Sequence, residues 1–304
     1  MKWKSLISAA LVLSGCAFDD SLVHDPELRL MFQPEMYMHV SQEGTVRFPT
    51  GESFAVCAWK NGTEEYLPLS EAVSHEVLMS QGPVESEVKD TLWVISEELM
   101  WPEVDENLTF LAFAPFDAGC TCSLTDGISF STDILTQQKD ILYTHPHADR
   151  HKVENGWVVP LQFSHALCKV DFRIKNRVTD KEEITIRRIS METARHKGCF
   201  TSLKTPQWEP DDSQKEIVFF EGACPTGNLP EKVGTGLLMI PQKLDTRLKV
   251  AFDYTTEQGS TISMDLYTTA VKTEMEAGYS YTYTLSVGID DVKLMQEIID
   301  YRFE

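Results

Sequence analysis

Residues 279–287 read Tyr-Ser-Tyr-Thr-Tyr-Thr-Leu-Ser-Val, and this stretch decides the fold class. Large apolar side chains occupy every second position, and small hydroxyl side chains occupy the positions between them. A period of two turns one face toward a core and the other toward water. The stretch therefore predicts a half-buried β-strand.

The same period recurs along the chain. Residues 248–254 and 262–266 alternate on either side of Glu257-Gln258-Gly259-Ser260, which predicts a hairpin. Residues 170–174 alternate as well, and the apolar run 108–113 ends at Pro115, a residue that stops a central strand.

Helical patterns are few. Residues 69–79 are compatible with a short helix capped by Ser70, and residues 131–142 with another capped by Thr132 or Asp133. Many strands separated by turns predict a mainly β protein, built from two tandem antiparallel β-sandwich domains with few short helices.

Length and charge narrow the class further. The chain has 304 residues, 42% hydrophobic and 24% charged, which is a globular composition with room for two cores. Its formal net charge of −20 argues against a nucleic-acid partner, because phosphate binding needs clustered cations. We expect an N-terminal domain over 28–158 and a C-terminal domain over 159–304, with strands possible in common across the boundary.

The N-terminus is an export signal. A short basic start precedes an apolar run at residues 5–13 that is too short to span a bilayer, so residues 1–15 predict a signal peptide. Leu13-Ser14-Gly15-Cys16 resembles a bacterial lipobox, which implies cleavage between Gly15 and Cys16 and a lipid on Cys16. The alternative is an ordinary signal peptide followed by a chance cysteine.

Residues 16–27 are short, acidic and aperiodic, and they predict a tether. Acidic residues directly after Cys16 resemble the surface-export signal of some diderm lipoproteins, so we expect a lipid-anchored protein on the outer membrane, at the cell surface. Retention at the inner leaflet is the alternative.

Cysteine and histidine give no clear site. Six cysteines follow Cys16 without the spacing of a compact disulfide framework, so free or partly paired thiols are favoured over a full set. One loop holds His145, His147 and His151, but Cys120-Thr121-Cys122 lacks zinc-ligand spacing, so we expect no metal. No catalytic motif or phosphate-binding loop is found, and we expect neither catalytic residues nor a cofactor.

Five segments, in order, resemble the fimbrillin-like family of bacterial surface lipoproteins, the subunits of type V pili. They are residues 48–59, 101–115, 138–142, 159–170 and 278–283. The chain departs from the family pattern at Glu52, where Asp is usual, and at 113–115, which lacks a Tyr. Its ending Ile299-Asp300-Tyr301 also differs, which leaves the role of the C-terminal strand most open.

The resemblance implies two transthyretin-like sandwiches, a fimbrial role, and assembly with other subunits by strand exchange. A surface protease would remove the first strand, which begins at residues 28–32, at a basic residue. Arg29 and Arg47 are available, and Arg47 is better placed because it separates the early strand from Phe48. Residues 292–299 are the candidate donor strand, or simply the last strand of the second domain.

Two other functions compete with assembly. A surface module that binds a host or bacterial glycan or protein would be supported by exposed Trp93, Trp157 or Trp208 on one face. A surface hydrolase would need converging reactive groups. His165, beside Phe163 and Leu167, is interpreted as a packing residue at the domain junction that bonds backbone, because no activating carboxylate is evident nearby.

Overall fold

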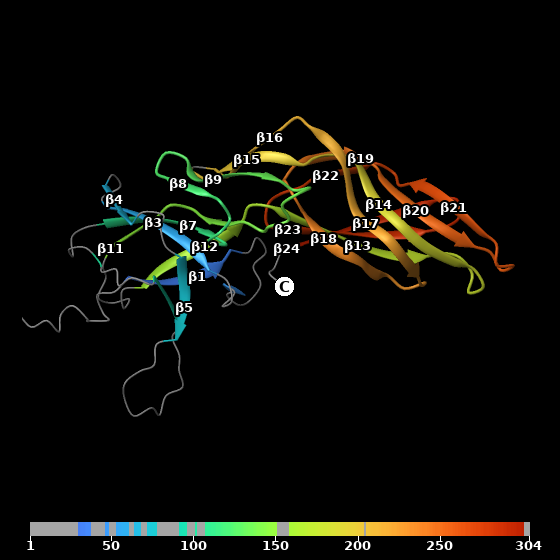
Figure 1. Ribbon diagram of the computed structural model, residues 1–304, viewed down its shortest axis with the longest axis horizontal. Coiled ribbons are helices and arrows are strands. Elements are labelled where there is room, and N and C mark those ends of the chain that lie inside the picture. Colours follow the sequence, from blue (N-terminus) through green and yellow to red (C-terminus); the bar gives the residue numbers. More distant parts are fainter. Residues whose placement is uncertain are drawn as a thin grey trace, which may run out of the picture.

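The computed structural model describes residues 30–37, 46–48, 53–60, 64–67, 72–77, 91–95, 101, 107–150, 158–203 and 205–300. Within these residues every regular element is a β-strand, and the described part of the molecule is elongated (Figure 1). The predicted mainly β fold of sandwich type is therefore confirmed.

The strands carry the labels of Figure 1, and their bounds are β1 Met31–Met36, β2 Val46–Arg47, β3 Phe54–Lys60, β4 Glu64–Leu67, β5 Ala72–Val77, β6 Thr91–Ile95, β7 Asn107–Ala114, β8 Thr121–Ser123, β9 Gly127–Asp133, β10 Leu142–Thr144, β11 His147–Arg150, β12 Val158–His165, β13 Cys168–Asn176, β14 Glu183–Arg195, β15 Lys197–Thr201, β16 Gln207–Pro210, β17 Gln214–Thr226, β18 Glu231–Met239, β19 Lys243–Thr246, β20 Leu248–Thr255, β21 Thr261–Tyr267, β22 Val271–Glu274, β23 Tyr279–Val287 and β24 Val292–Asp300.

The first sheet is built from β1–β7 and β10–β12, in the order β11-β7-β10-β12-β1-β6-β5-β3-β4 with β2 beside β1. The pairings close on themselves, because β3 bonds to β7 as well as to β5. Closure encloses a core of buried aromatic and aliphatic side chains, among them Phe32, Phe54, Phe110 and Phe163. Each such residue contributes about 1.5–3 kcal/mol by burial.

A sandwich of two four-stranded sheets forms the C-terminal part of the chain. One sheet has the order β18-β13-β23-β24 and the other β17-β14-β20-β21. Their inner faces share a core that includes Phe172, Tyr283 and Phe252. The outward face of the second sheet carries cross-strand ion pairs, such as Arg187 to Asp253 at 3.0 Å. Exposed pairs of this kind add little stability but favour the observed register.

A third sheet, β16-β15-β9-β8, joins segments from both sides of the predicted domain boundary. Its β15 pairs with β9, so Phe200 lies opposite Phe130 and both belong to one apolar cluster. In addition, β12 at residues 158–165 bonds to β1 and β10 of the first sheet. The division at 158/159 stays a prediction, and the sheets share strands across that position.

The expectation of purely antiparallel sheets was wrong at two places. β1 runs parallel to β12, and β13 runs parallel to β23. Parallel neighbours need long connections, and each pair is separated by more than a hundred residues of chain. No local pattern in the sequence marks such a pairing.

Both predicted helices were wrong. β5 occupies the middle of residues 69–79, because it bonds to β3 and to β6 across the sheet. Over 131–142, β9 ends at Asp133, and a single turn follows in which Gln137 N donates to Asp133 O at 2.8 Å. Asp133 Oδ1 accepts from Leu135 N at 3.1 Å, so the capping chemistry is present without a helix.

The predicted hairpin and the strand at Pro115 are confirmed. β20 and β21 pair antiparallel across residues 256–260, where Gly259 has a φ of +79°. β7 ends at Ala114, and the Ala114–Pro115 peptide bond is cis.

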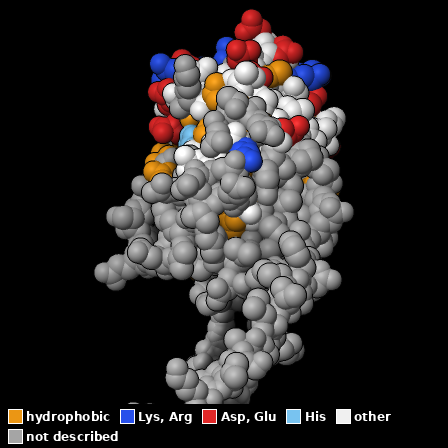
Figure 2. Space-filling view, turned by 90° about the vertical axis from the view of Figure 1, so that its left-hand side faces the viewer, with side chains coloured by type: hydrophobic (Ala, Val, Ile, Leu, Met, Phe, Trp, Pro, Cys, Tyr) orange, Lys and Arg blue, Asp and Glu red, His pale blue; other side chains and the backbone are white. Residues whose placement is uncertain are grey.

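Figure 2 shows the end of the molecule that carries the first sheet. On the described part of that face, acidic and basic side chains lie intermixed, with scattered hydrophobic atoms between them.

Candidate assembly site and the adjacent groove

β1 is an inner strand of the first sheet. It pairs in parallel with β12 from Met31↔Val158 to Met36↔Phe163, and it meets β6 at Phe32↔Trp93. The ladder continues past the strand, since Tyr37 N donates to Phe163 O at 2.7 Å. Removing β1 would leave backbone groups of β12 and β6 without these partners.

Side chains of β1 and of Leu30 directly before it fill pockets in the core. Leu30, Phe32 and Met36 are buried at 1%, 0% and 6% exposure. The Phe32 ring lies edge-on to Phe54 and Phe110, with ring centroids 6.2 and 6.0 Å apart. Alternate side chains therefore fix both the register and the depth of the strand.

Arg47 lies directly between the early strands and the core residue Phe48. Arg47 ends β2, where it pairs with Glu35 of β1. Phe48 follows at once and is a core residue, with its ring centroid 5.0 Å from that of Phe163. A cut after Arg47 would separate β1 and β2 from the rest of the core. Arg29, Gly15 and Cys16 lie outside the described residues.

β24 is an edge strand whose described pairing is to β23 alone. Three of its apolar residues are strongly exposed, Met295 at 65%, Ile298 at 50% and Ile299 at 52%. An edge strand presents unpaired backbone groups, and apolar side chains on it mark a surface for pairing with another chain.

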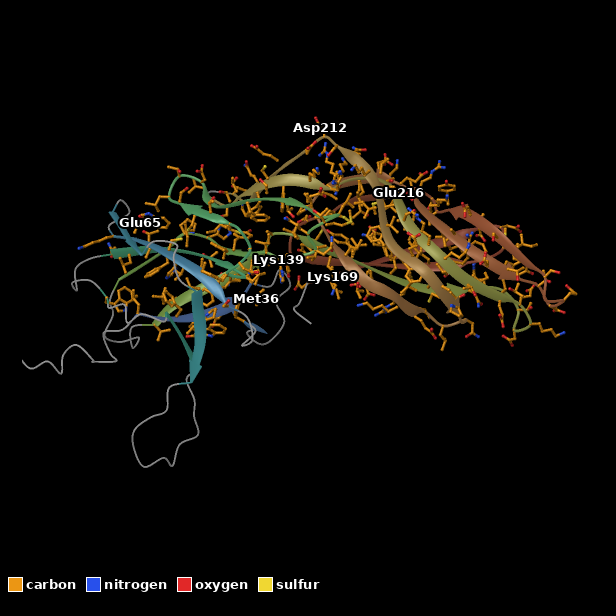
Figure 3. All side chains as sticks on the ribbon, in the orientation of Figure 1. Met36, Glu65, Lys139, Lys169, Asp212 and Glu216 are labelled. Atoms are coloured by element: carbon orange, nitrogen blue, oxygen red, sulfur yellow. The ribbon has the colours of Figure 1, made fainter. Side chains whose placement is uncertain are left out.

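A groove of about 750 Å³ lies beside β1, between the first sheet and the segments that lead into β16 and β23. Glu35 and Tyr37 come from β1 and its end, Gln162 comes from β12, and Glu276 faces them from the segment before β23. Figure 3 labels Met36, Lys139 and Lys169 around the middle of the molecule, where these parts meet.

His165 has a carboxylate partner, contrary to the sequence interpretation. Its side chain is buried, and Nδ1 lies 2.9 Å from Asp140 Oδ2. The interpretation as a junction packing residue agrees with this place, because Ala166 and Leu167 connect the first sheet to β13. The partner was missed because Asp140 lies 25 residues away in sequence.

In a second histidine–carboxylate pair, the carboxylate belongs to Asp133, which lies near Asp140 in the sequence. His196 is buried, and its Nδ1 lies 2.9 Å from Asp133 Oδ1. Desolvation raises the pKa of Asp133, but hydrogen bonds from His196 and from Leu135 N outweigh it, and the net pKa is lowered. Between the two pairs, the Gln138 side chain accepts from Leu238 N at 2.7 Å. These polar contacts connect residues 133–140 to β12 of the first sheet and to β18 of the C-terminal sandwich.

The tryptophans expected for a glycan-binding face do not form one in the described residues. Trp93 is 4% exposed in the first core, and Trp208 is half-buried with Nε1 donating to Ala166 O at 2.8 Å. Trp157 lies outside the described residues.

The histidine loop borders the groove. His145 and His147 line it, whereas His151 lies outside the described residues. Across the part of the chain that the structure describes, no group of three or more His, Cys, Asp or Glu side chains converges as a metal site. In the same residues, no helix is long and apolar enough to cross a membrane.

The architecture and its exposed edge define a class of multi-sheet β-sandwich proteins. The profile of the fimbrillin-like family matches residues 41–300. The chain belongs to this family. The resemblance found in five segments is thereby confirmed.

Solved structures show the same fold. A fimbrial protein from Bacteroides vulgatus is 14% identical with a TM-score of 0.62, covering 90% of this chain and 99% of that chain. A candidate cell adhesion protein from Bacteroides ovatus is 12% identical with a TM-score of 0.54, covering 91% and 98%. Another from Bacteroides uniformis is 16% identical with a TM-score of 0.52, covering 90% and 98%. No curated protein sequence matches the chain.

Proposed function

We propose that the chain is a structural or adhesive subunit, or an anchor, of a cell-surface fimbria, and that it assembles by protease-triggered strand exchange. The observation that carries the proposal is the position of β1 inside the first sheet, where its alternate side chains are buried. β2, which pairs with β1, ends at Arg47. The role needs no catalytic residue.

Release of β1 would create a groove ready to accept another strand. The exposed backbone of β12 and β6 would regain partners from an extended segment, and pockets vacated by Leu30, Phe32 and Met36 would take its alternate side chains. Such a joint is long-lived, because all of its contacts must break together.

Residues 292–299 of β24 are the proposed donor. Met295 and Ile299 lie exposed on the same face of this edge strand, with the same spacing in sequence as Phe32 and Met36 of β1. Transfer to a neighbouring subunit would bury side chains that are half or more exposed in the monomer.

Membrane attachment by a lipid on Cys16 completes the proposal. An anchor subunit would keep Cys16 and β1, whereas a stalk subunit would lose both after cleavage at Arg47 or Arg29. Mass spectrometry of the protein on cells tests this: a lipidated Cys16 indicates an anchor or precursor at the outer membrane, and a start at Phe48 indicates a processed stalk.

Assembly is tested with the full chain carrying Cys16→Ala. We expect a monomer on size exclusion, and oligomers after an Arg-specific protease generates a terminus at Phe48. Arg47→Ala should remain monomeric under the same treatment, and Arg29→Ala should behave like the parent chain. A chain that is cut before Phe48 yet stays monomeric after β1 has dissociated contradicts the stalk role.

The donor is tested separately. Met295→Asp with Ile299→Asp should reduce oligomer formation by trimmed protein, because both side chains would enter apolar pockets. Ile298→Asp is the matched control, since it places the same charge on an exposed apolar residue of the same strand whose side chain lies on the opposite face. Equal assembly by all variants would exclude β24 as the donor.

A second candidate function is binding of a surface saccharide without polymerisation. The groove beside β1 favours it, because Tyr37, Gln162 and Glu35 offer an aromatic face with hydrogen-bonding groups to one ligand. A glycan array probed with the monomeric Cys16→Ala chain tests it. Binding that Gln162→Ala abolishes would support this function, and no binding would remove it.

A further inference from the structure

The peptide bond between Arg47 and Phe48 is held by the fold on both of its sides. On the N-terminal side, β2 pairs antiparallel with the end of β1, where Arg47 lies opposite Glu35. On the C-terminal side, the Phe48 side chain is 3% exposed and belongs to the core of the first sheet. A backbone ladder therefore flanks the bond on one side and a buried ring flanks it on the other.

Three other aromatic rings surround the ring of Phe48. Its centroid lies 5.6 Å from that of Phe54 in β3, 5.2 Å from that of Trp93 in β6 and 5.0 Å from that of Phe163 in β12. We call these three rings the aromatic cage. Buried rings at such distances stabilise one another beyond the effect of burial alone. Phe48 is thus fastened to three strands that stay in the chain when β1 is removed.

This arrangement protects the bond from a protease. Packed segments of a protein are cut from locally opened forms, because a protease needs access to the chain on both sides of the cut. To free the bond, the pairing of β2 with β1 must break and the Phe48 ring must leave the aromatic cage. Exposing a buried phenylalanine makes the open form rarer by more than one power of ten.

The aromatic cage also supports β1. The ring centroid of Phe54 lies 6.2 Å from that of Phe32 in β1, and Trp93 is the residue of β6 that pairs with Phe32. Two of the three rings that hold Phe48 therefore hold β1 as well. Opening of the cage removes packing from the residues on which β1 rests, so the cut and the release of β1 are coupled.

We propose that the burial of Phe48 in the aromatic cage is an autoinhibitory contact, which keeps the chain uncut and unassembled until the cage opens. The inference rests on the proposed function, because it concerns cleavage at Arg47. The rate of cleavage then depends on the free energy of a local opening. After the cut the ring can return to the cage, since none of its three partners belongs to the removed segment.

The test compares the full chain carrying Cys16→Ala with a synthetic peptide of residues 43–53. Both are treated with an Arg-specific protease, and mass spectrometry follows the appearance of a terminus at Phe48. The folded chain should be cut at least about tenfold more slowly than the peptide. Equal rates would overturn the inference. This comparison needs no further variant, so it holds even where a substituted chain fails to fold.

Variants then assign the protection to the ring. Phe48→Ala should be cut at least about tenfold faster than the parent chain, after correction with a peptide that carries the same substitution. Phe48→Leu should be cut at an intermediate rate, because it keeps an apolar side chain. Phe219→Ala is the matched control, since it removes a buried ring from the core of the C-terminal sandwich.

Two results with these variants would overturn the inference. One is a corrected rate for Phe48→Ala that equals the parent rate. The other is an equal acceleration in Phe219→Ala, which would mean that the cut follows unfolding of the whole chain rather than opening of the cage.

Hydrogen exchange gives a readout that needs no protease. In Phe48→Ala the amides of β2 and of the end of β1 should exchange faster, whereas those of β14 and β20 should keep the parent rates. Unchanged exchange in β1 and β2 would overturn the inference.

The two proposals fail separately. A chain that is cut as fast as the peptide and then assembles would remove the autoinhibitory contact and leave the proposed function intact. A chain that is cut slowly, and whose trimmed form stays monomeric, would retain the contact and contradict the stalk role.

Discussion

Replacing Phe32 by Ala should show that β1 is a structural part of the untrimmed chain. The Phe32 side chain is fully buried, and its ring contacts the rings of Phe54 and Phe110. Removing a buried phenylalanine costs about 3–5 kcal/mol, which includes the lost burial, the cavity and the edge-on ring contacts. This is a large part of the roughly 5–15 kcal/mol that stabilises a typical domain.

The assay is urea unfolding of the Cys16→Ala chain, followed by circular dichroism. With a slope of about 1–3 kcal/mol per molar, Phe32→Ala should lower the midpoint of the transition that involves the first sheet by about 2 M. Gln33→Ala is the matched control, because Gln33 is the exposed neighbour on the same strand and should change stability by less than about 0.5 kcal/mol. A loss below about 1 kcal/mol in Phe32→Ala would refute the packing of β1 and, with it, the proposed seat for a donor strand.

Three further outcomes are expected. Gly236→Ala should destabilise the chain by about 1–3 kcal/mol in urea unfolding, since Gly236 has a φ of +77° and an added Cβ would clash with the Asp171 carboxylate. Gly259→Ala should cost less, because Gly259 has a similar φ but lies in open space. Equal losses in the two variants would contradict the steric argument. Cys168, fully buried with a pKa raised by burial to about 12, should resist alkylation at pH 8 until the chain unfolds, and rapid labelling of native protein would contradict its burial. Because the pKa of Asp133 is lowered in the folded chain, its contribution to stability is complete above its unfolded pKa and is lost as the pH falls through its folded pKa. The urea midpoint of Asp133→Asn should therefore fall less between pH 7 and pH 3 than that of the parent chain. An identical fall in both chains would rule this out.

The difference between local and long-range strand pairing explains why the sequence predicted some elements correctly and others wrongly. Hairpins such as β20–β21 follow from neighbouring residues, because alternation and a glycine turn specify the pair locally. β5 has a sequence compatible with a helix, and it is a strand because β3 and β6 supply backbone partners on both sides. Local propensity is a weak preference that tertiary pairing overrides.

The residues of the candidate site also differ in whether the sequence alone could indicate them. Arg47 is predicted from sequence as a cleavage site, because a basic residue directly precedes the family motif that begins at Phe48, and this assignment stays a prediction. The contact of Asp140 with His165 was not found, since it joins residues far apart in the chain. The burial of Trp93 also needed the closed sheet, because an aromatic residue in a short strand is equally compatible with an exposed face.

By itself, the sequence determined the β class, the family and the position of Arg47 before the first core motif, because these depend on short-range patterns of side chains. Only the tertiary structure decided that β1 lies parallel to β12, that β15 pairs with β9 across the predicted boundary, and that β24 is an exposed edge. The physical reason is that pairing between distant strands depends on which backbone groups and apolar faces remain unsatisfied after the whole chain has folded.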